Sequence, residues 1–226
     1  RWLEQVDAVL LAWYPGQECG NAIADVLFGG VNPSGRLPAS WPLRYEHNPS
    51  YQSYPGSRGA VEYTEGLFCG YRHYTSTKTP TLYPFGYGLT YSTFVYGDVT
   101  VSADEINPGD TITVSVPVTN TSDREGTEVV QFYVHDPVST LQRPVRELRG
   151  FARVTVEPGK TAMATCELNM RAFAFFEDQK QCWIAEAGEF VIEAGASSED
   201  IRASRSITLN ADWIEAAADA WLSTHI

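Results

Sequence analysis

Apolar residues occupy every second position of the stretch Ile112-Thr113-Val114-Ser115-Val116-Pro117-Val118. Successive side chains of a strand point to opposite faces of its sheet, so this period of two predicts a strand buried on one face. The same period returns in residues 99–101, 130–134, 154–156 and 190–194. Turn-forming residues separate the runs, as at Glu157-Pro158-Gly159. The pattern predicts an antiparallel sandwich of about seven strands over residues 98–210.

Aromatic residues are unusually dense in residues 45–97, which precede the predicted sandwich. The segment is also rich in Pro, Gly, Ser and Thr, and it shows no helical or alternating period. Aromatic side chains bury large areas, which favours a segment that lies on a neighbouring surface over a free tether. We expect residues 45–97, called the wrap below, to be an ordered connection between two domains.

The sequence pattern of residues 1–44 predicts part of an α/β layer. Residues 6–13 form a near-continuous apolar run, typical of a strand that is buried on both faces. Apolar residues at helical spacing then predict a helix over residues 20–28, which Gly29-Gly30 would end. One strand and one helix cannot enclose a core. We therefore expect an α/β sandwich remnant that packs on polypeptide outside this sequence.

The last predicted segment is residues 211–226, which follow the sandwich. They are rich in alanine, and Trp213, Ile214 and Trp221 fall roughly on one helical face. This spacing predicts a short helix that docks on the rest of the chain.

Composition argues against several kinds of partner. The 16 basic and 28 acidic residues give a formal net charge of -12, which repels a phosphate backbone, so we expect no nucleic acid partner. No apolar run approaches the ~20 residues that a bilayer span requires, so we expect no membrane partner. The four cysteines show neither CxxC pairing nor histidines at metal-ligand spacing, and we expect no metal site.

Three blocks, in this order, carry a resemblance to a known family. The first block includes Trp13-Tyr14-Pro15-Gly16-Gln17-Glu18 and Asn32-Pro33-Ser34-Gly35-Arg36-Leu37-Pro38. The second includes Tyr63-Thr64-Glu65-Gly66 and Pro84-Phe85-Gly86-Tyr87-Gly88-Leu89-Thr90-Tyr91. The third includes Arg143-Pro144-Val145-Arg146-Glu147-Leu148-Arg149-Gly150-Phe151. The chain resembles glycoside hydrolase family 3, with the end of its α/β sandwich domain followed by its fibronectin type III-like domain, an all-β, immunoglobulin-like sandwich.

The resemblance implies an N-terminal (β/α)8 barrel with an aspartate nucleophile, and a sandwich loop that supplies a glutamate acid/base. Retaining hydrolysis needs two carboxyl groups about 5–5.5 Å apart and no cofactor. Neither carboxylate has a counterpart here, since Asp212 follows the last predicted strand and lies in the wrong domain. We expect the catalytic pair upstream of this chain, in the same or a cleaved polypeptide, and no turnover by the chain alone.

The predicted function is the C-terminal part of a retaining, exo-acting β-glucosidase that hydrolyses terminal β-linked glucosyl residues of oligosaccharides or glycosides. A β-xylosidase stays open, because the residues that select the sugar would lie mostly in the absent barrel and loops. The alternative is a noncatalytic module that binds carbohydrate or a cell wall through exposed tyrosines. Binding without cleavage would distinguish the two.

Four residues are candidates for the border of a substrate pocket: Glu18, Glu65, Tyr54 and Tyr63. Glu18 follows a predicted strand, where ligands of α/β sheets bind, but a glutamate in a first helical turn also stabilises the helix dipole. Glu65 could contact a sugar or pair with Arg72. A tyrosine ring can stack on a sugar or pack between domains. For all four residues, the structural interpretation is the favoured one.

Two further features concern the cellular compartment. Asn120-Thr121-Ser122 matches the N-glycosylation pattern at a predicted strand end, which suits the surface of a secreted glycoprotein. We therefore expect an extracellular protein.

Cys166 and Cys182 flank a predicted turn region and form either a disulfide or two free buried thiols. The remaining pair would be Cys19 and Cys69.

Overall fold

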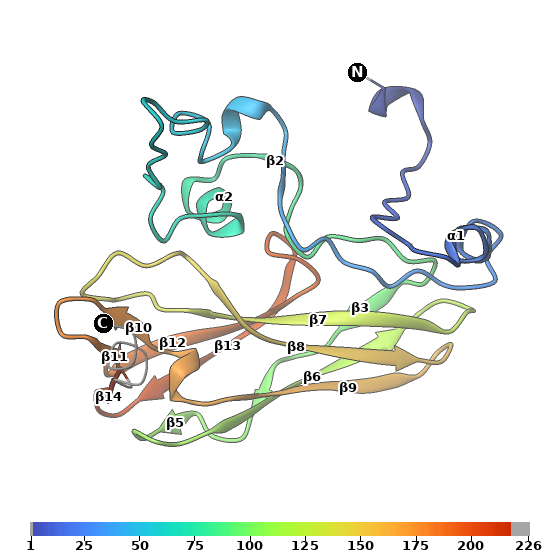
Figure 1. Cartoon of the computed structure of the whole chain (residues 1–226). Helices are drawn as coiled ribbons and strands as arrows, with labels where there is room; N and C mark the ends of the chain where they lie inside the picture. The colour runs from blue at the N-terminus through green and yellow to red at the C-terminus, as the bar shows by residue number, and fades with distance from the viewer. Residues whose placement is uncertain (1, 218–226) are drawn as a thin grey trace.

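The computed structural model describes residues 2–217. Two stacked sheets form a sandwich, and the segment that precedes them lies along one side of it (Figure 1). No helix in the described part of the chain is both long and apolar enough to cross a bilayer.

The first sheet of the sandwich has five strands in the order β5-β13-β12-β7-β8. Their bounds are Glu105–Ile106 (β5), Ile201–Leu209 (β13), Gly188–Gly195 (β12), Gly126–His135 (β7) and Glu147–Val156 (β8). All neighbours pair antiparallel except β13 and β5, which pair parallel. The register of β7 against β8 shifts between Phe132 and Tyr133, and such bulges re-aim side chains.

The second sheet is built around one central strand. Its strands are Phe94–Tyr96 (β3), Thr100–Val101 (β4), Ile112–Asn120 (β6) and Thr161–Leu168 (β9). Strands β3, β4 and β9 all pair antiparallel with β6. Every second residue of β6 is buried, which confirms the alternation from which the sandwich was predicted.

The core lies between the two sheets. Val114 and Val116 from β6 face Phe132 from β7 and Phe190 from β12, and each of these side chains is at most 1% exposed. The fully buried members of this cluster all come from residue 94 onward. Burial of apolar surface is the main favourable term in folding, so the sandwich holds most of the stabilising contacts.

A third, small sheet corrects the prediction for the C-terminal segment. It contains Phe175–Glu177 (β10), Cys182–Ala185 (β11) and Trp213–Ala216 (β14), after a short helix at Met170–Ala172 (η3). Residues 213–216 are therefore a strand and not a helix, because β11 offers an unpaired edge to which they add. The remainder of the predicted helix, including Trp221, lies outside the described residues.

The N-terminal segment has one predicted element and lacks the other. Helix α1, Cys19–Leu27, confirms the predicted helix, and Gly29 follows it at a φ of 77°. The predicted strand at residues 6–13 is wrong for the structure, which has only a short helix at Leu3–Gln5 (η1) and no strand there. A strand needs a hydrogen-bonding neighbour, and within the described residues this run has none.

The wrap contains a helix that the sequence did not suggest. Before β3 its elements are Tyr45–His47 (η2), Tyr71–Thr77 (α2) and Thr81–Tyr83 (β2). Strand β2 pairs with Trp41–Pro42 (β1), which lies just before the wrap. The hydroxyl of Tyr71 accepts a hydrogen bond of 2.7 Å from the Leu148 N–H of β8. The Tyr71 ring stacks on Phe85 and meets Tyr133 edge-on. These contacts fix α2 against the first sheet.

Candidate functional site

The four predicted pocket-border residues are not gathered into one site. Helix α1 and the loop between η2 and α2 lie at opposite sides of the molecule (Figure 1), so Glu18 is far from the other three. Glu18 is exposed and accepts a hydrogen bond of 2.7 Å from the side chain of Asn21. Tyr54 and Tyr63 are 62% and 85% exposed, whereas Glu65 is half-buried. Their assignment to a substrate pocket stays a prediction.

The expected ion pair between Glu65 and Arg72 is not formed. Arg72 instead lies 3.3 Å from Glu147 at the start of β8, so it connects α2 to the sandwich. The carboxylate of Glu147 also pairs with Arg143 at 2.7 Å and with Arg149 at 2.9 Å. Burial favours the neutral acid, but these three guanidinium groups outweigh it and lower the pKa of Glu147.

Asp136 shares Arg143 with Glu147, yet its pKa moves the other way. Arg143 lies 2.9 Å from Asp136, and both side chains are only 4% exposed. Burial raises the pKa of this carboxyl, and Arg143 offsets only part of the effect. One arginine therefore does not compensate for desolvation at Asp136, whereas three do so at Glu147.

The structure contradicts the predicted surface position of Asn120. Its side chain is fully buried, and its amide nitrogen donates to the backbone carbonyls of Arg124 at 2.7 Å and Val156 at 2.9 Å. Its carbonyl oxygen accepts from the Ser122 N–H. A glycan on this nitrogen would break both donated bonds, so Asn120 is a structural residue of the folded sandwich and not a glycosylation site.

The disulfide that was considered between Cys166 and Cys182 is absent. Both thiols are free, and they lie in different sheets, on β9 and β11. Cys19 and Cys69 are free as well. Burial raises the pKa of the Cys166 thiol, which keeps that side chain in its neutral form.

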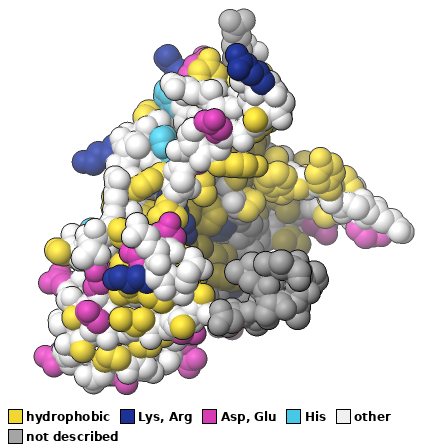
Figure 2. Space-filling model, turned by 60° about the vertical axis from the view of Figure 1, so that its left-hand side comes forward, with side chains coloured by type: hydrophobic (Ala, Val, Ile, Leu, Met, Phe, Trp, Pro, Cys, Tyr) yellow, Lys and Arg dark blue, Asp and Glu magenta, His cyan; other side chains and the backbone are white. Residues whose placement is uncertain are grey.

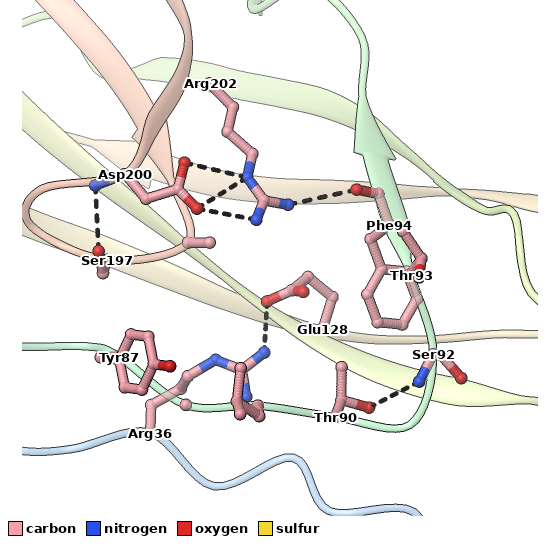
Figure 3. A pocket seen from close by; sticks show the side chains of 13 residues that line it. Arg36, Tyr87, Thr90, Ser92, Thr93, Phe94, Glu128, Ser197, Asp200 and Arg202 are labelled. Carbon is pink, nitrogen blue, oxygen red and sulfur yellow. Dashed lines mark hydrogen bonds and ion pairs between the residues drawn. The ribbon is translucent and has the colours of Figure 1, made fainter. Parts of the chain in front are cut away.

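A polar cavity of about 320 Å³ lies between the end of the wrap and the β12–β13 loop. Arg36, Tyr87 and Thr90 line it from the N-terminal side, and Glu128 and Arg202 line it from the sandwich (Figure 3). Gly88 also lines it, at a point where a Cβ atom would clash with the carbonyl oxygen of Gly35. This site was not predicted from the sequence, although Arg36 and Glu128 are charged residues within otherwise apolar or turn-forming surroundings.

Two ion pairs set the electrostatics of this cavity. Arg36 lies 2.7 Å from Glu128, and these side chains are 8% and 4% exposed. Arg202 lies 2.8 Å from Asp200 nearer the solvent, and its guanidinium also stands over the ring of Tyr96 at 4.8 Å. The two arginines and two carboxylates cancel, so the lining has no net formal charge.

A second cavity, of about 290 Å³, lies within the wrap. Glu46, His47, Tyr51 and His73 are among its lining residues, and burial lowers the pKa of His73. Within residues 2–217, no three His, Cys, Asp or Glu side chains are grouped as ligands of a metal ion would be.

Two family models match the chain. Residues 1–91 match the glycosyl hydrolase family 3 C-terminal domain, and residues 128–198 match a fibronectin type III-like domain. The second match falls within the sandwich described above. The first covers α1 and nearly all of the wrap.

Two curated relatives are each 45% identical to the chain. They are the thermostable beta-glucosidase B of Acetivibrio thermocellus, matched over 209 residues, and the beta-glucosidase of Rhizobium radiobacter, matched over 217 residues. The matches cover 92% and 94% of this chain. The chain spans only 28% and 26% of the two relatives.

Solved structures agree with these matches. The beta-glucosidase of Kluyveromyces marxianus in complex with glucose superimposes with a TM-score of 0.88 at 39% identity, over 96% of this chain and 26% of that one. Beta-glucosidase 3B of Thermotoga neapolitana gives a TM-score of 0.88 at 36% identity, over 95% of this chain and 30% of that one. The chain therefore belongs to glycoside hydrolase family 3 and corresponds to the C-terminal part of the beta-glucosidases that it matches.

Proposed function

We propose that this chain is the C-terminal part of a retaining, exo-acting β-glucosidase whose catalytic aspartate and glutamate lie in upstream polypeptide. The observation that carries the proposal is its 45% identity, over 209 residues, to a relative named as a thermostable beta-glucosidase. The substrate would be a β-glucoside or an oligosaccharide with a terminal β-linked glucosyl residue. No cofactor is needed, because two carboxyl groups suffice for this chemistry.

The exposed apolar surface of the N-terminal segment supports a missing neighbour. Val9, Leu10 and Trp13 are 44%, 44% and 57% exposed, and Phe28 just after α1 is 90% exposed. Hydrophobic side chains also gather on the part of the molecule above the sandwich (Figure 2). Apolar patches of this kind mark surfaces that pack on other polypeptide. We infer that the upstream half of the α/β sandwich covers this surface and gives residues 6–13 the strand neighbours that they lack.

The fibronectin type III-like sandwich would act as a brace in this arrangement. Arg72 pairs with Glu147, and Tyr71 bonds to Leu148, so α2 of the wrap is attached to β8 at two points. Arg124 donates to the carbonyl oxygen of Gly29, which joins the end of α1 to the sandwich as well. Such contacts would hold the α/β layer in a fixed position without any contact between this chain and the sugar.

Reconstitution tests the proposal. The chain would be assayed on an aryl β-glucoside alone and after co-expression with the upstream 72% or so of the Acetivibrio thermocellus relative, the share that this chain does not span. We expect no turnover from the chain alone and hydrolysis from the pair, with the β-anomer of glucose released first. The control pair carries an upstream part in which the nucleophilic aspartate is replaced. Turnover by the chain alone, or by the control pair, would contradict the proposal.

The sugar and the compartment are separate parts of the proposal. Aryl β-xyloside and aryl β-glucoside, compared at equal concentration, distinguish a β-xylosidase from a β-glucosidase through the ratio of kcat/KM. Secretion predicts that activity of the native enzyme is found in the culture medium and not in washed cells. Activity confined to the cells would contradict it.

A second candidate function rests on the exposure of two tyrosines. Tyr54 and Tyr63 present most of their side chains to solvent, as the rings of a carbohydrate-binding surface do. If the chain is a noncatalytic module, the chain alone would bind to insoluble glucan. Replacement of both tyrosines by alanine would abolish this binding. If the chain is instead part of a catalytic enzyme, we expect it not to bind insoluble glucan.

A further inference from the structure

The polar cavity between the wrap and the β12–β13 loop has the features of a ligand site. Its volume is about 320 Å³, and its walls come from segments far apart in the sequence: Arg36, residues 87–94, Glu128 and residues 196–202. A molecule bound there would contact both the sandwich and the residues that precede it.

Glu128 supplies an acceptor with no donor. Its Oε1 atom accepts from Arg36 at 2.7 Å and from the Val129 N–H at 2.8 Å. Its Oε2 atom takes part in no hydrogen bond or ion pair with residues 2–217, although the side chain is only 4% exposed and lines the cavity. This oxygen keeps a small exposure to the cavity, where it can accept a hydrogen bond from a hydroxyl group or a water molecule.

The other side of the cavity supplies donors and a ring face. Arg202 points into the space above Glu128, and Thr93 lines the cavity as well (Figure 3). The hydroxyl of Thr90, which is also in the lining, already donates to the side chain of Asn32 at 2.7 Å. Tyr87 lines the same space and offers an aromatic surface. Carboxylate, guanidinium, hydroxyl and ring together match a ligand with several hydroxyl groups and an apolar face.

The charge of the lining selects among classes of ligand. An anion would meet the free oxygen of Glu128, and a cation would meet the guanidinium groups of Arg36 and Arg202. The two ion pairs leave no net formal charge to attract either one. We propose that the cavity binds a neutral polyol of monosaccharide size, with Glu128 as the acceptor of its hydroxyl groups.

Titration of the full chain with D-glucose tests this proposal. The readout is the shift of backbone amide NMR signals of residues 90–93 and 196–202, which flank the cavity. We expect a saturable shift with a dissociation constant on the order of 1 mM, because a small ligand makes few contacts. Trimethylamine N-oxide, a cosolute without hydroxyl groups, controls for the general effect of a cosolute. Sodium sulfate tests for an anion site.

Two variants and a matched control locate the site. Glu128→Gln keeps the side-chain volume and removes the charge, and we expect binding about ten-fold weaker since hydrogen bonds to a charged group are the stronger ones. Ala196→Leu fills the cavity from its lining and leaves every charge in place, so it decides the matter even if Glu128→Gln fails to fold. Glu157→Gln, on the exposed β8–β9 turn, is expected to bind like the unmodified chain.

Three outcomes would overturn the proposal. They are the absence of a saturable shift with D-glucose, a shift of equal size with sulfate, and unchanged binding in Ala196→Leu. The first would mean that the cavity holds water only.

Discussion

At the scale of single residues, buried polar side chains define the shape of the sandwich. The side chain of Asn120 bonds to backbone groups of Ser122 and Arg124, just after β6, and of Val156 at the end of β8. Glu147 gathers three arginines from two segments. A polar group in an apolar setting is stable only with its partners in place, so each of these residues fixes a loop as well as itself.

Replacing Asn120 with alanine should destabilise the sandwich by about 3 kcal/mol, since it removes two donated bonds and leaves backbone groups unsatisfied. Urea unfolding followed by tryptophan fluorescence measures the loss. The matched control is Asn210→Ala, at an exposed asparagine, for which we expect a change within about 0.5 kcal/mol. Equal losses for the two variants would show that the Asn120 bonds contribute little.

Replacing Glu147 with glutamine should cost about 3–5 kcal/mol at neutral pH, because it leaves Arg72 and Arg149 without their carboxylate partner and Arg143 with Asp136 alone. Folding lowers the pKa of Glu147, so its stabilising contribution is present above the ordinary value of 4.5 and is lost as the pH falls through the lowered pKa. The gap between the variant and the unmodified chain should therefore narrow in acid. Unfolding free energies measured from about pH 7 to about pH 2 check it.

Asp136→Asn serves as the comparison for that experiment. Burial raises the pKa of Asp136, so the ionised carboxylate is disfavoured in the folded state and its contribution to stability grows as the pH falls. We expect a smaller loss at neutral pH than for Glu147→Gln. A larger loss for Asp136→Asn would reverse the order that the arginine contacts predict.

The burial of Asn120 could have been predicted from its sequence position. Residues 112, 114, 116 and 118 were assigned to the core face of a strand, and residue 120 continues that series. The glycosylation motif favoured a surface position for Asn120, whereas the alternation favoured a buried one, and the side chain is buried. A short motif says nothing about which face of a strand it lies on.

At the scale of elements, tertiary contacts decide where the local sequence is ambiguous. Helix α2 consists of Tyr-Arg-His-Tyr-Thr-Ser-Thr, and aromatic and β-branched residues are poor helix formers. Its packing on β8 supplies the stability that propensity does not, which is why the helix escaped prediction. Residues 6–13 show the reverse case, because a strand-like sequence stays without a strand where no neighbour pairs with it.

Tyr71→Phe should loosen α2 without unfolding the sandwich. The change removes the acceptor of the Leu148 N–H, a cost of roughly 1–3 kcal/mol, and keeps the ring that stacks on Phe85. We expect faster amide hydrogen exchange in residues 71–77 and at Leu148, with β6 and β12 unchanged.

The control for this helix is Tyr74→Phe. Tyr74 is 3% exposed, and its hydroxyl forms no hydrogen bond with the described residues. The amide exchange rates of the Tyr74→Phe variant should match those of the unmodified chain. If both variants speed exchange equally, the aromatic packing and not the Tyr71 hydroxyl holds the helix.

At the scale of the whole molecule, the chain is a sandwich with its own core and a segment that depends on it. All fully buried members of the main apolar cluster lie after residue 93. Contacts from the preceding residues reach this sandwich from outside, through Tyr71 and Arg72 of the wrap and through Arg36. The sandwich is the part that satisfies the requirements of a domain by itself.

A polypeptide of residues 93–217 should therefore fold alone. We expect a single cooperative unfolding transition, with a midpoint below that of the full chain because Tyr133 and Glu128 lose their partners Tyr71 and Arg36. Near-UV circular dichroism and calorimetry measure it. Residues 1–92 made alone are the comparison, and they should show no cooperative transition.

The strands of the sandwich could be predicted from the sequence, but the contacts between the sandwich and the residues before it could not. Alternation in residues 112–118 and 130–134 reports burial directly, so the strands could be predicted. The polar cavity joins Arg36 to Glu128 across 92 positions, and no local pattern reports such a contact. The predicted pocket border at Glu18 depended on a strand at residues 6–13 that the structure lacks, and the structure leaves Glu18 apart from the other three candidates.

The exposed rings and aliphatic side chains near α1 have a practical consequence for the protein in solution. Tyr14 and Phe28 are 99% and 90% exposed, and neighbouring apolar groups share that surface. Two copies that meet there lower their contact with water, and no closed symmetry limits the number that join. Concentrated preparations of the chain should therefore turn cloudy, and the charge of -12 will slow this only until added salt screens it.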